Sequence, residues 1–122
     1  MSKVVVIDDE PFILMMIEDK LRKAGIHVVT LRESRDALSV IRREKPDLVI
    51  LDWMMPEMSG IEICKMVKAD AELKETPVFL LTAKGQDTDR QIGLQCGASM
   101  YITKPFSPKA LLEIVSKVID GK

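Results

Sequence analysis

The chain has 122 residues, with 18 Lys and Arg against 19 Asp and Glu and a formal net charge of −1 at pH 7. This length predicts one domain whose core is large enough to fold without disulfides or a structural metal. The near-balance of charge disfavours a nucleic-acid binder, because that class carries an excess of Lys and Arg.

Five short apolar runs alternate with longer amphipathic stretches. Runs this rich in Val, Ile and Leu are typical of strands that are buried on both faces of a parallel sheet. The alternation predicts an α/β fold, a (βα)5 chain with a doubly wound five-stranded parallel sheet covered by helices on both sides. The expected strands are Val4 to Ile7, His27 to Leu31, Leu48 to Leu51, Val78 to Leu81 and Met100 to Thr103.

The first two helices are predicted from apolar spacing and from end signals. Gly25 is expected to stop the first helix, and Ser34 is expected to cap the start of the second. The residues expected on their inward faces are Ile13, Ile17, Leu21, Ala24, Leu38 and Ile41.

The remaining three helices carry similar signals. Ser59 is expected to cap the third helix, and Ser107-Pro108 is a cap followed by a favoured first residue for the last. The stretch from Asp87 to Cys96 predicts a short and weak fourth helix, because Gly93 lies inside it. The residues expected on the inward faces of the third and last helices are Ile63, Met66, Val67, Leu111, Ile114, Val115 and Val118.

The cysteines and the first residues of the chain indicate the cellular compartment. Cys64 and Cys96 form no CxxC pair and are too few for a disulfide framework or a zinc site, so we expect buried thiols in a reducing compartment. The first apolar run is too short for a signal peptide or a membrane span. We therefore expect a soluble cytoplasmic protein that is one domain over residues 1–122, with no output domain and no contact with a membrane or nucleic acid.

Polar side chains stand at the ends of four predicted strands. In an open α/β sheet, ligands bind beyond the carboxyl ends of the strands, so these side chains are expected to converge. Carboxylates in close range repel one another and require positive charge. Lys104 can supply one charge, and the hard oxygen ligands favour Mg²⁺ (or Mn²⁺) for the rest. The converging residues are Asp8, Asp9, Asp52, Thr82 and Lys104.

Several enzyme classes lack their signature residues in this chain. The turn after the first strand is acidic and matches neither GxGxxG nor GxxxxGK[ST], which argues against nicotinamide cofactors and P-loop nucleotides. There is no GxSxG, and the single histidine, His27, opens the second strand away from the strand-end cluster. Ser/His/Asp hydrolysis therefore has little support.

These residues resemble the receiver domain of bacterial two-component response regulators, most of all the free-standing chemotaxis-type receivers. The resemblance covers essentially the whole chain, and its four blocks occur in the order and spacing of that family. It implies a flavodoxin-like sheet with strand order 2-1-3-4-5. The blocks are Asp8-Asp9-Glu10-Pro11, Asp52 to Gly60, Thr82-Ala83-Lys84 and Lys104-Pro105-Phe106.

The resemblance also implies the chemistry. Asp52 would accept a phosphoryl group from a phosphohistidine of a sensor kinase or phosphotransferase, and the domain would catalyse only its own phosphorylation and dephosphorylation. Asp9 and Asp52 would bind Mg²⁺ directly, Asp8 mainly through water, and the backbone carbonyl of Met54 would be a third protein ligand. Lys104 would pair with the phosphoryl oxygens.

The remaining matches concern signal relay. Thr82 would move to bond the phosphoryl group, and Tyr101 would rotate into the vacated space. The face formed by the fourth helix, fifth strand and fifth helix would then bind a downstream protein, with the chain a monomer or a phosphorylation-dependent dimer. Ala83, Trp53 and Pro105 would neighbour the phosphoryl pocket, and the Lys104-Pro105 bond would be cis.

One departure from the family pattern concerns rate. Met54 and Lys84 would flank the route of the water that attacks the acyl phosphate. An apolar side chain and a flexible cation are poor at orienting that water, so we expect slow self-dephosphorylation.

Three alternatives remain open at this stage. A degenerate receiver would act by protein binding alone. A small flavin-binding electron carrier shares the strand pattern but needs a Ser/Thr/Gly-rich first loop. A phosphatase similar to the haloacid dehalogenases also uses Mg²⁺ and an aspartyl nucleophile, but places that nucleophile after the first strand.

Overall fold

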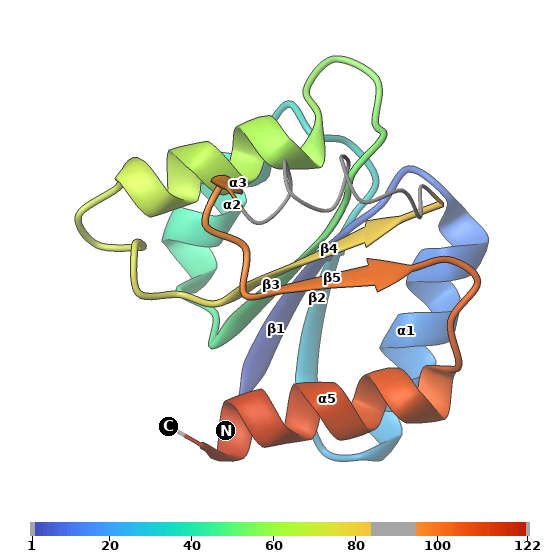
Figure 1. The fold of residues 1–122 in the computed structure, drawn as a ribbon. Coiled ribbons are helices and arrows are strands. Elements are labelled where there is room, and N and C mark those ends of the chain that lie inside the picture. The colour runs from blue at the N-terminus through green and yellow to red at the C-terminus, as the bar shows by residue number, and fades with distance from the viewer. Residues whose placement is uncertain (1, 84–94, 122) are drawn as a thin grey trace.

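The computed structural model describes residues 2–83 and 95–121, which form one parallel sheet flanked by helices (Figure 1). The strand order is β2-β1-β3-β4-β5, as the sequence analysis predicts. The strands are β1 (Lys3–Ile7), β2 (His27–Leu31), β3 (Leu48–Asp52), β4 (Val78–Thr82) and β5 (Met100–Thr103), and the helices are α1 (Pro11–Lys23), α2 (Ala37–Glu44), α3 (Gly60–Ala69) and α5 (Pro108–Asp120).

Two hydrophobic cores lie on the two faces of the sheet. Helices α1 and α5 cover one face, and α2 and α3 cover the other (Figure 1). Alternate residues of one strand point to opposite faces, so Val5 and Ile7 of β1 join the core under α2 and α3. Val4 and Val6 join the core under α1 and α5. Burial on both faces explains why the strands are nearly continuous apolar runs.

The strand ends carry the first functional information. Two predicted strands have the expected bounds, and the other three are each one residue longer. Asp52 is the last residue of β3 and Thr82 the last residue of β4, and both are buried. The backbone of each is therefore fixed by the sheet, and both side chains reach the same edge.

The end signals of three helices are confirmed. The Ser59 side chain accepts a hydrogen bond from the Glu62 N–H in a capping box at the start of α3. The Ser107 hydroxyl accepts from the Ala110 N–H at the start of α5. Gly25 follows the end of α1 at φ +84°, a left-handed conformation that glycine adopts without cost.

Two helix predictions are wrong. Ser34 does not cap α2, because Asp36 occupies the N-cap position and the Ser34 hydroxyl is buried against another loop. Ala24 is not on the inward face of α1, because it lies beyond the last helical turn and is exposed. Leu14 is buried on that helix instead. Of the predicted fourth helix, residues 87–94 lie outside the described residues.

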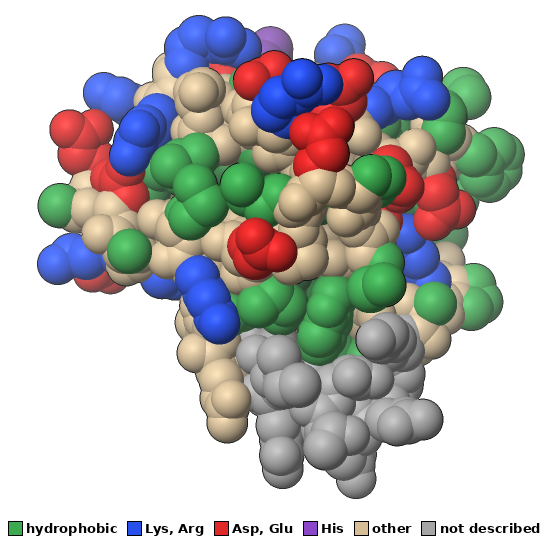
Figure 2. All heavy atoms as spheres, turned by 90° about the horizontal axis from the view of Figure 1, so that it is seen from above, with side chains coloured by type: hydrophobic (Ala, Val, Ile, Leu, Met, Phe, Trp, Pro, Cys, Tyr) green, Lys and Arg blue, Asp and Glu red, His purple; other side chains and the backbone are tan. Residues whose placement is uncertain are grey.

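The burial of the two thiols agrees with the sequence-based expectation. Cys64 and Cys96 are buried and free, and the Cys64 thiol donates a 3.4 Å hydrogen bond to the Cys96 carbonyl oxygen. Acidic and basic side chains are interspersed on the face that carries α2 and α3 (Figure 2). Within the described ranges, no helix has both the length and the apolar character to cross a bilayer.

Candidate functional site

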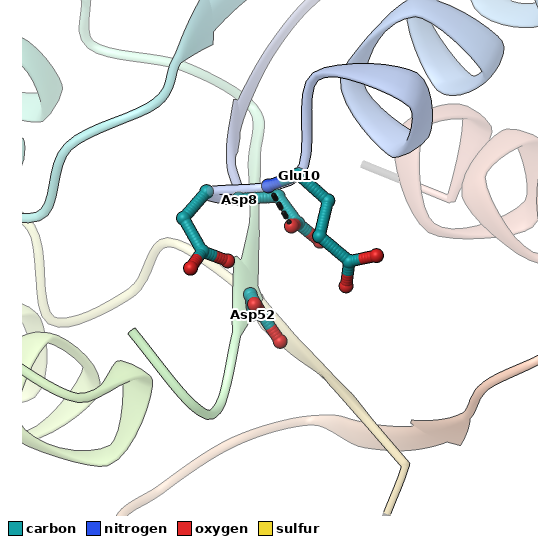
Figure 3. A group of neighbouring side chains, drawn as sticks. Asp8, Glu10 and Asp52 are labelled. Atoms are coloured by element: carbon teal, nitrogen blue, oxygen red, sulfur yellow. Dashed lines mark hydrogen bonds between the residues drawn. The ribbon is translucent and has the colours of Figure 1, made fainter. Parts of the chain in front are cut away.

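Four carboxylates meet at the carboxyl edge of the sheet. Strands β1 and β3 are neighbours, so Asp8, which follows β1, lies beside Asp52 at the end of β3. Asp8, Glu10 and Asp52 gather around a common space (Figure 3). With Asp9, each contributes one oxygen, and these four oxygens lie within 4.8 Å of one another. Asp8 is 0% exposed and Asp52 is 4% exposed, so water screens their repulsion poorly.

Lys104 brings a positive charge into this cluster. Its ammonium donates hydrogen bonds to Asp8 Oδ2 at 2.9 Å, Glu10 Oε1 at 3.0 Å and Asp52 Oδ1 at 3.3 Å. The lysine follows β5, and its backbone N–H donates to the Thr82 carbonyl oxygen at 2.6 Å. The side chain therefore reaches past the end of β4 to the carboxylates that follow β1 and end β3.

Burial and charge shift the protonation of these groups. Burial, the negative charge of Asp8 and a hydrogen bond with Asp9 raise the pKa of Asp52 to about 7, although Lys104 opposes the shift. Burial also raises the pKa of Asp8, against the hydrogen bonds from the Glu10 N–H and from Lys104. Burial would lower the pKa of Lys104, but its hydrogen bonds with Asp8 and Glu10 outweigh burial and raise it. One ammonium thus leaves the cluster short of positive charge.

The donor set fits a hard divalent cation. All four side-chain donors are carboxylate oxygens, which suit Mg²⁺ or Mn²⁺ better than a metal that prefers nitrogen or sulfur. A cation among them would relieve the repulsion that raises the pKa of Asp52. Asp8, Asp9 and Asp52 are therefore placed as the sequence analysis predicts. Direct binding by Asp9 and by the Met54 backbone carbonyl stays a prediction.

Glu10 is the residue that the sequence analysis missed. It belongs to the acidic run Asp8-Asp9-Glu10 but is not among the groups that the sequence predicts to converge. It lies at the N-cap of α1, and its carboxylate binds the ammonium of Lys104. The sequence does contain a signal for Glu10, because it is the third consecutive acid after the first strand.

The other predicted site residues that the structure describes lie at or just after the ends of β3, β4 and β5. Thr82 is buried at the end of β4, next to the strand that Asp52 ends. The Lys104-Pro105 bond is cis, as expected. Pro105 and Ala83 are exposed, and the Met54 side chain is also exposed beside the site. Lys84 lies outside the described residues.

Two aromatic rings connect the site to β5. Trp53, directly after Asp52, is buried. Its ring meets that of Tyr101 edge-on, with centroids 5.7 Å apart and an interplanar angle of 88°. This arrangement is a favourable one for aromatic pairs. The Trp53 ring thus lies between the residue that ends β3 and Tyr101 of β5.

Gly60 explains how α3 begins so close to the site. A Cβ at this position would collide with the carbonyl oxygen of Asp52. Its backbone N–H donates a 2.9 Å hydrogen bond to the Trp53 carbonyl oxygen. A glycine here allows the first turn of α3 to pack directly on the backbone of the acidic strand end.

Comparison with known proteins gives one consistent result. The family model described as "Response regulator receiver domain" matches residues 4–116. The chain is 38% identical over 118 residues to the alkaline phosphatase synthesis transcriptional regulatory protein PhoP of Bacillus subtilis, covering 97% of this chain and 48% of that protein. It is 40% identical over 116 residues to the phosphate regulon transcriptional regulatory protein PhoB of Pseudomonas aeruginosa, covering 95% and 51%. The chain thus spans about half the length of these curated relatives.

Solved structures agree with this result. The chemotaxis protein CheY4 of Vibrio cholerae is 35% identical with a TM-score of 0.90, and the match covers 97% of this chain and 98% of that one. The BeF3-activated DrrB receiver domain is 38% identical with a TM-score of 0.89, and the match covers 98% of both chains.

Proposed function

The chain belongs to the response regulator receiver domain family, and we propose that it is a phosphorylation-activated switch in which Asp52 accepts the phosphoryl group. The observation that carries the proposal is the Lys104 ammonium, which contacts both Asp8 and Asp52 at the strand ends. Most ion pairs at a protein surface are exposed and contribute little, whereas the Lys104 side chain is 13% exposed and contacts three carboxylates. A buried nucleophile beside a fixed ammonium fits phosphoryl transfer.

The proposed reaction moves one phosphoryl group from nitrogen to oxygen. A carboxylate oxygen of Asp52 attacks the phosphorus of a phosphohistidine, the P–N bond breaks, and the imidazole leaves with its electron pair. Lys104 lies within 3.3 Å of Asp52, where its charge can neutralise the transferred oxygens. Bound Mg²⁺ would add positive charge at the same oxygens. Asp8, Asp9, Asp52 and the Met54 carbonyl are its proposed ligands.

Relay of the signal is proposed to run along β4 and β5. The buried Thr82 hydroxyl would bond the phosphoryl oxygens, and Tyr101 would move into the space beside it. Because the Tyr101 ring contacts Trp53, its movement would break the edge-on ring pair. The proposed outcome is a changed affinity of the surface around β5 and α5 for a downstream protein.

A first prediction tests the reaction itself. Incubation with acetyl phosphate and Mg²⁺ should add the mass of one phosphoryl group to the intact protein, because a small acyl phosphate can replace the phosphohistidine donor. Excess EDTA should prevent the gain, since the carboxylates would then repel the incoming phosphoryl group. No gain in mass with Mg²⁺ would favour the degenerate receiver. Continuous turnover of a phosphomonoester would favour the phosphatase.

The proposed docking site for the phosphohistidine protein is the exposed apolar side of α1. Phe12 and Met15 are 70% and 62% exposed, and together with Met16 and Asp19 they line a shallow hollow of about 300 Å³. Phe12 lies two residues after Glu10 of the acidic cluster. A protein that brings its histidine to Asp52 must cover this edge of the domain, and it would bury the apolar side chains as it does so.

The docking proposal predicts a separation between two phosphoryl donors. Replacing Phe12 and Met15 together by serine should lower the rate of transfer from a cognate phosphohistidine protein about tenfold or more, because buried aromatic anchors dominate interface energies. Phosphorylation by acetyl phosphate should stay within about twofold, since no protein surface is involved. Rapid-quench phosphotransfer measures both rates. An equal loss with both donors would place the effect in the acidic site and contradict docking on α1.

A further inference from the structure

Ser34 connects two loops that are far apart in the sequence. It lies between β2 and α2 and is 3% exposed. Its hydroxyl donates a 2.8 Å hydrogen bond to the Pro56 carbonyl oxygen and accepts a 3.1 Å hydrogen bond from the Met58 N–H. A serine hydroxyl has one proton to donate and lone pairs to accept, and this geometry uses both capacities.

The segment that Ser34 holds is a tight and strained turn. The Met58 N–H also bonds to the Pro56 carbonyl oxygen at 2.8 Å, two residues back, with Glu57 between them at φ +72°. These are features of a γ-turn with positive φ, which is rare and strained for a residue other than glycine. Such a conformation persists only when the surrounding structure holds it. The Ser34 hydroxyl bonds to both ends of this turn.

The turn lies within the loop that leaves the acidic site. The loop runs from Trp53 to Ser59, directly after Asp52. Its start is fixed to the sheet, because the Trp53 N–H donates to the Leu81 carbonyl oxygen at 2.8 Å. Arg35 and Glu57 also connect it to the segment before α2, but both side chains are more than half exposed, and such surface ion pairs contribute little. Ser34, by contrast, is buried.

We infer that Ser34 is a positioning residue for the cation and phosphoryl site. By holding the turn at Pro56 to Met58, its hydroxyl limits the movement of the backbone at Met54, the proposed carbonyl ligand. Residues that orient metal ligands through hydrogen bonds commonly change metal affinity about 10–100-fold when they are replaced. The inference rests on the proposed function, because Met54 is a ligand only if the site takes a cation.

The test is a Mg²⁺ titration followed by the fluorescence of Trp53, the single tryptophan, which lies next to Asp52. Ser34→Ala should weaken Mg²⁺ binding about tenfold. Ser39→Ala, at an exposed position of α2, is the matched control and should bind as the wild type does. Ser34→Thr keeps the hydroxyl and should recover most of the affinity. Equal affinity in the wild type and Ser34→Ala would overturn the inference.

A second variant separates positioning from general destabilisation. Glycine adopts φ +72° without cost, so Glu57→Gly reduces the need to hold the turn. In the Glu57→Gly background, Ser34→Ala should therefore cost clearly less than tenfold in Mg²⁺ affinity. If Ser34→Ala still lowers the Mg²⁺ affinity tenfold in that background, the loss does not come from release of the turn, and the inference is overturned. Absence of any Mg²⁺ response in the wild-type protein would instead contradict the proposed function.

Discussion

With asparagine in place of Asp52, we expect phosphorylation by acetyl phosphate to fall on the order of a thousandfold or more, to below detection by intact mass. The amide has no carboxylate oxygen to attack phosphorus, and we expect none of the neighbouring acids to replace it. Asp8 is fully buried, and its carboxylate accepts hydrogen bonds from the Glu10 N–H and the Lys104 ammonium. Asp52 is therefore the acid that we expect to carry the phosphoryl group.

Asp47 offers a matched control for this substitution. It directly precedes β3, the strand that Asp52 ends, and its carboxylate accepts a 2.9 Å hydrogen bond from the Lys3 N–H at the opposite edge of the sheet. Asp47→Asn is the same chemical change outside the site and should leave phosphorylation within about twofold of the wild type. Full phosphorylation of Asp52→Asn would show that another residue is the acceptor and would remove the central element of the proposal.

The strand-end residues of the site could be predicted because two simple rules agree there. Apolar runs stop at Asp8, Asp52 and Thr82, and parallel strands bring their carboxyl ends to one edge. The fold follows from the same pattern, since strands buried on both faces differ clearly from amphipathic helices. Local sequence is sufficient to predict the location of a side chain when that location depends only on the position of the residue within its own strand.

Contacts between distant segments could not be predicted in this way. Glu10 reaches Lys104 across 94 positions of the chain, and only the three-dimensional placement of the N-cap of α1 shows that contact. Ser34 stands shortly before a helix, where a cap is the usual role, yet its hydroxyl bonds to a loop 22 and 24 residues away. A capping residue and a buried connecting residue look the same in a sequence, because both need only a small hydroxyl side chain.

Without a divalent cation, Asp52→Asn should also stabilise the protein at neutral and alkaline pH. The pKa of Asp52 is raised to about 7 in the folded state by burial first and by the charge of Asp8 second. In the unfolded chain the pKa of an aspartate is about 4. Between these values the folded state retains a proton that the unfolded state releases, so this group lowers the stability as pH rises from about 4 to 7. Asparagine carries no such charge and removes the loss.

We expect the variant to gain a few kcal/mol in free energy of unfolding at pH 8 in EDTA, at most about 4 kcal/mol for a pKa raised from about 4 to about 7, and no more than a few tenths near pH 4. For a domain of this size each kcal/mol of that gain corresponds to a rise in melting temperature of roughly 3–6 °C. Thermal and urea unfolding from pH 4 to 8 measure it, with Asp47→Asn as the control that should show no gain. Saturating Mg²⁺ should shrink the difference, because only the wild type keeps the Asp52 carboxylate that binds the cation and gains stability from it. A gain that is equal at pH 4 and pH 8 would contradict an origin in the ionisation of Asp52.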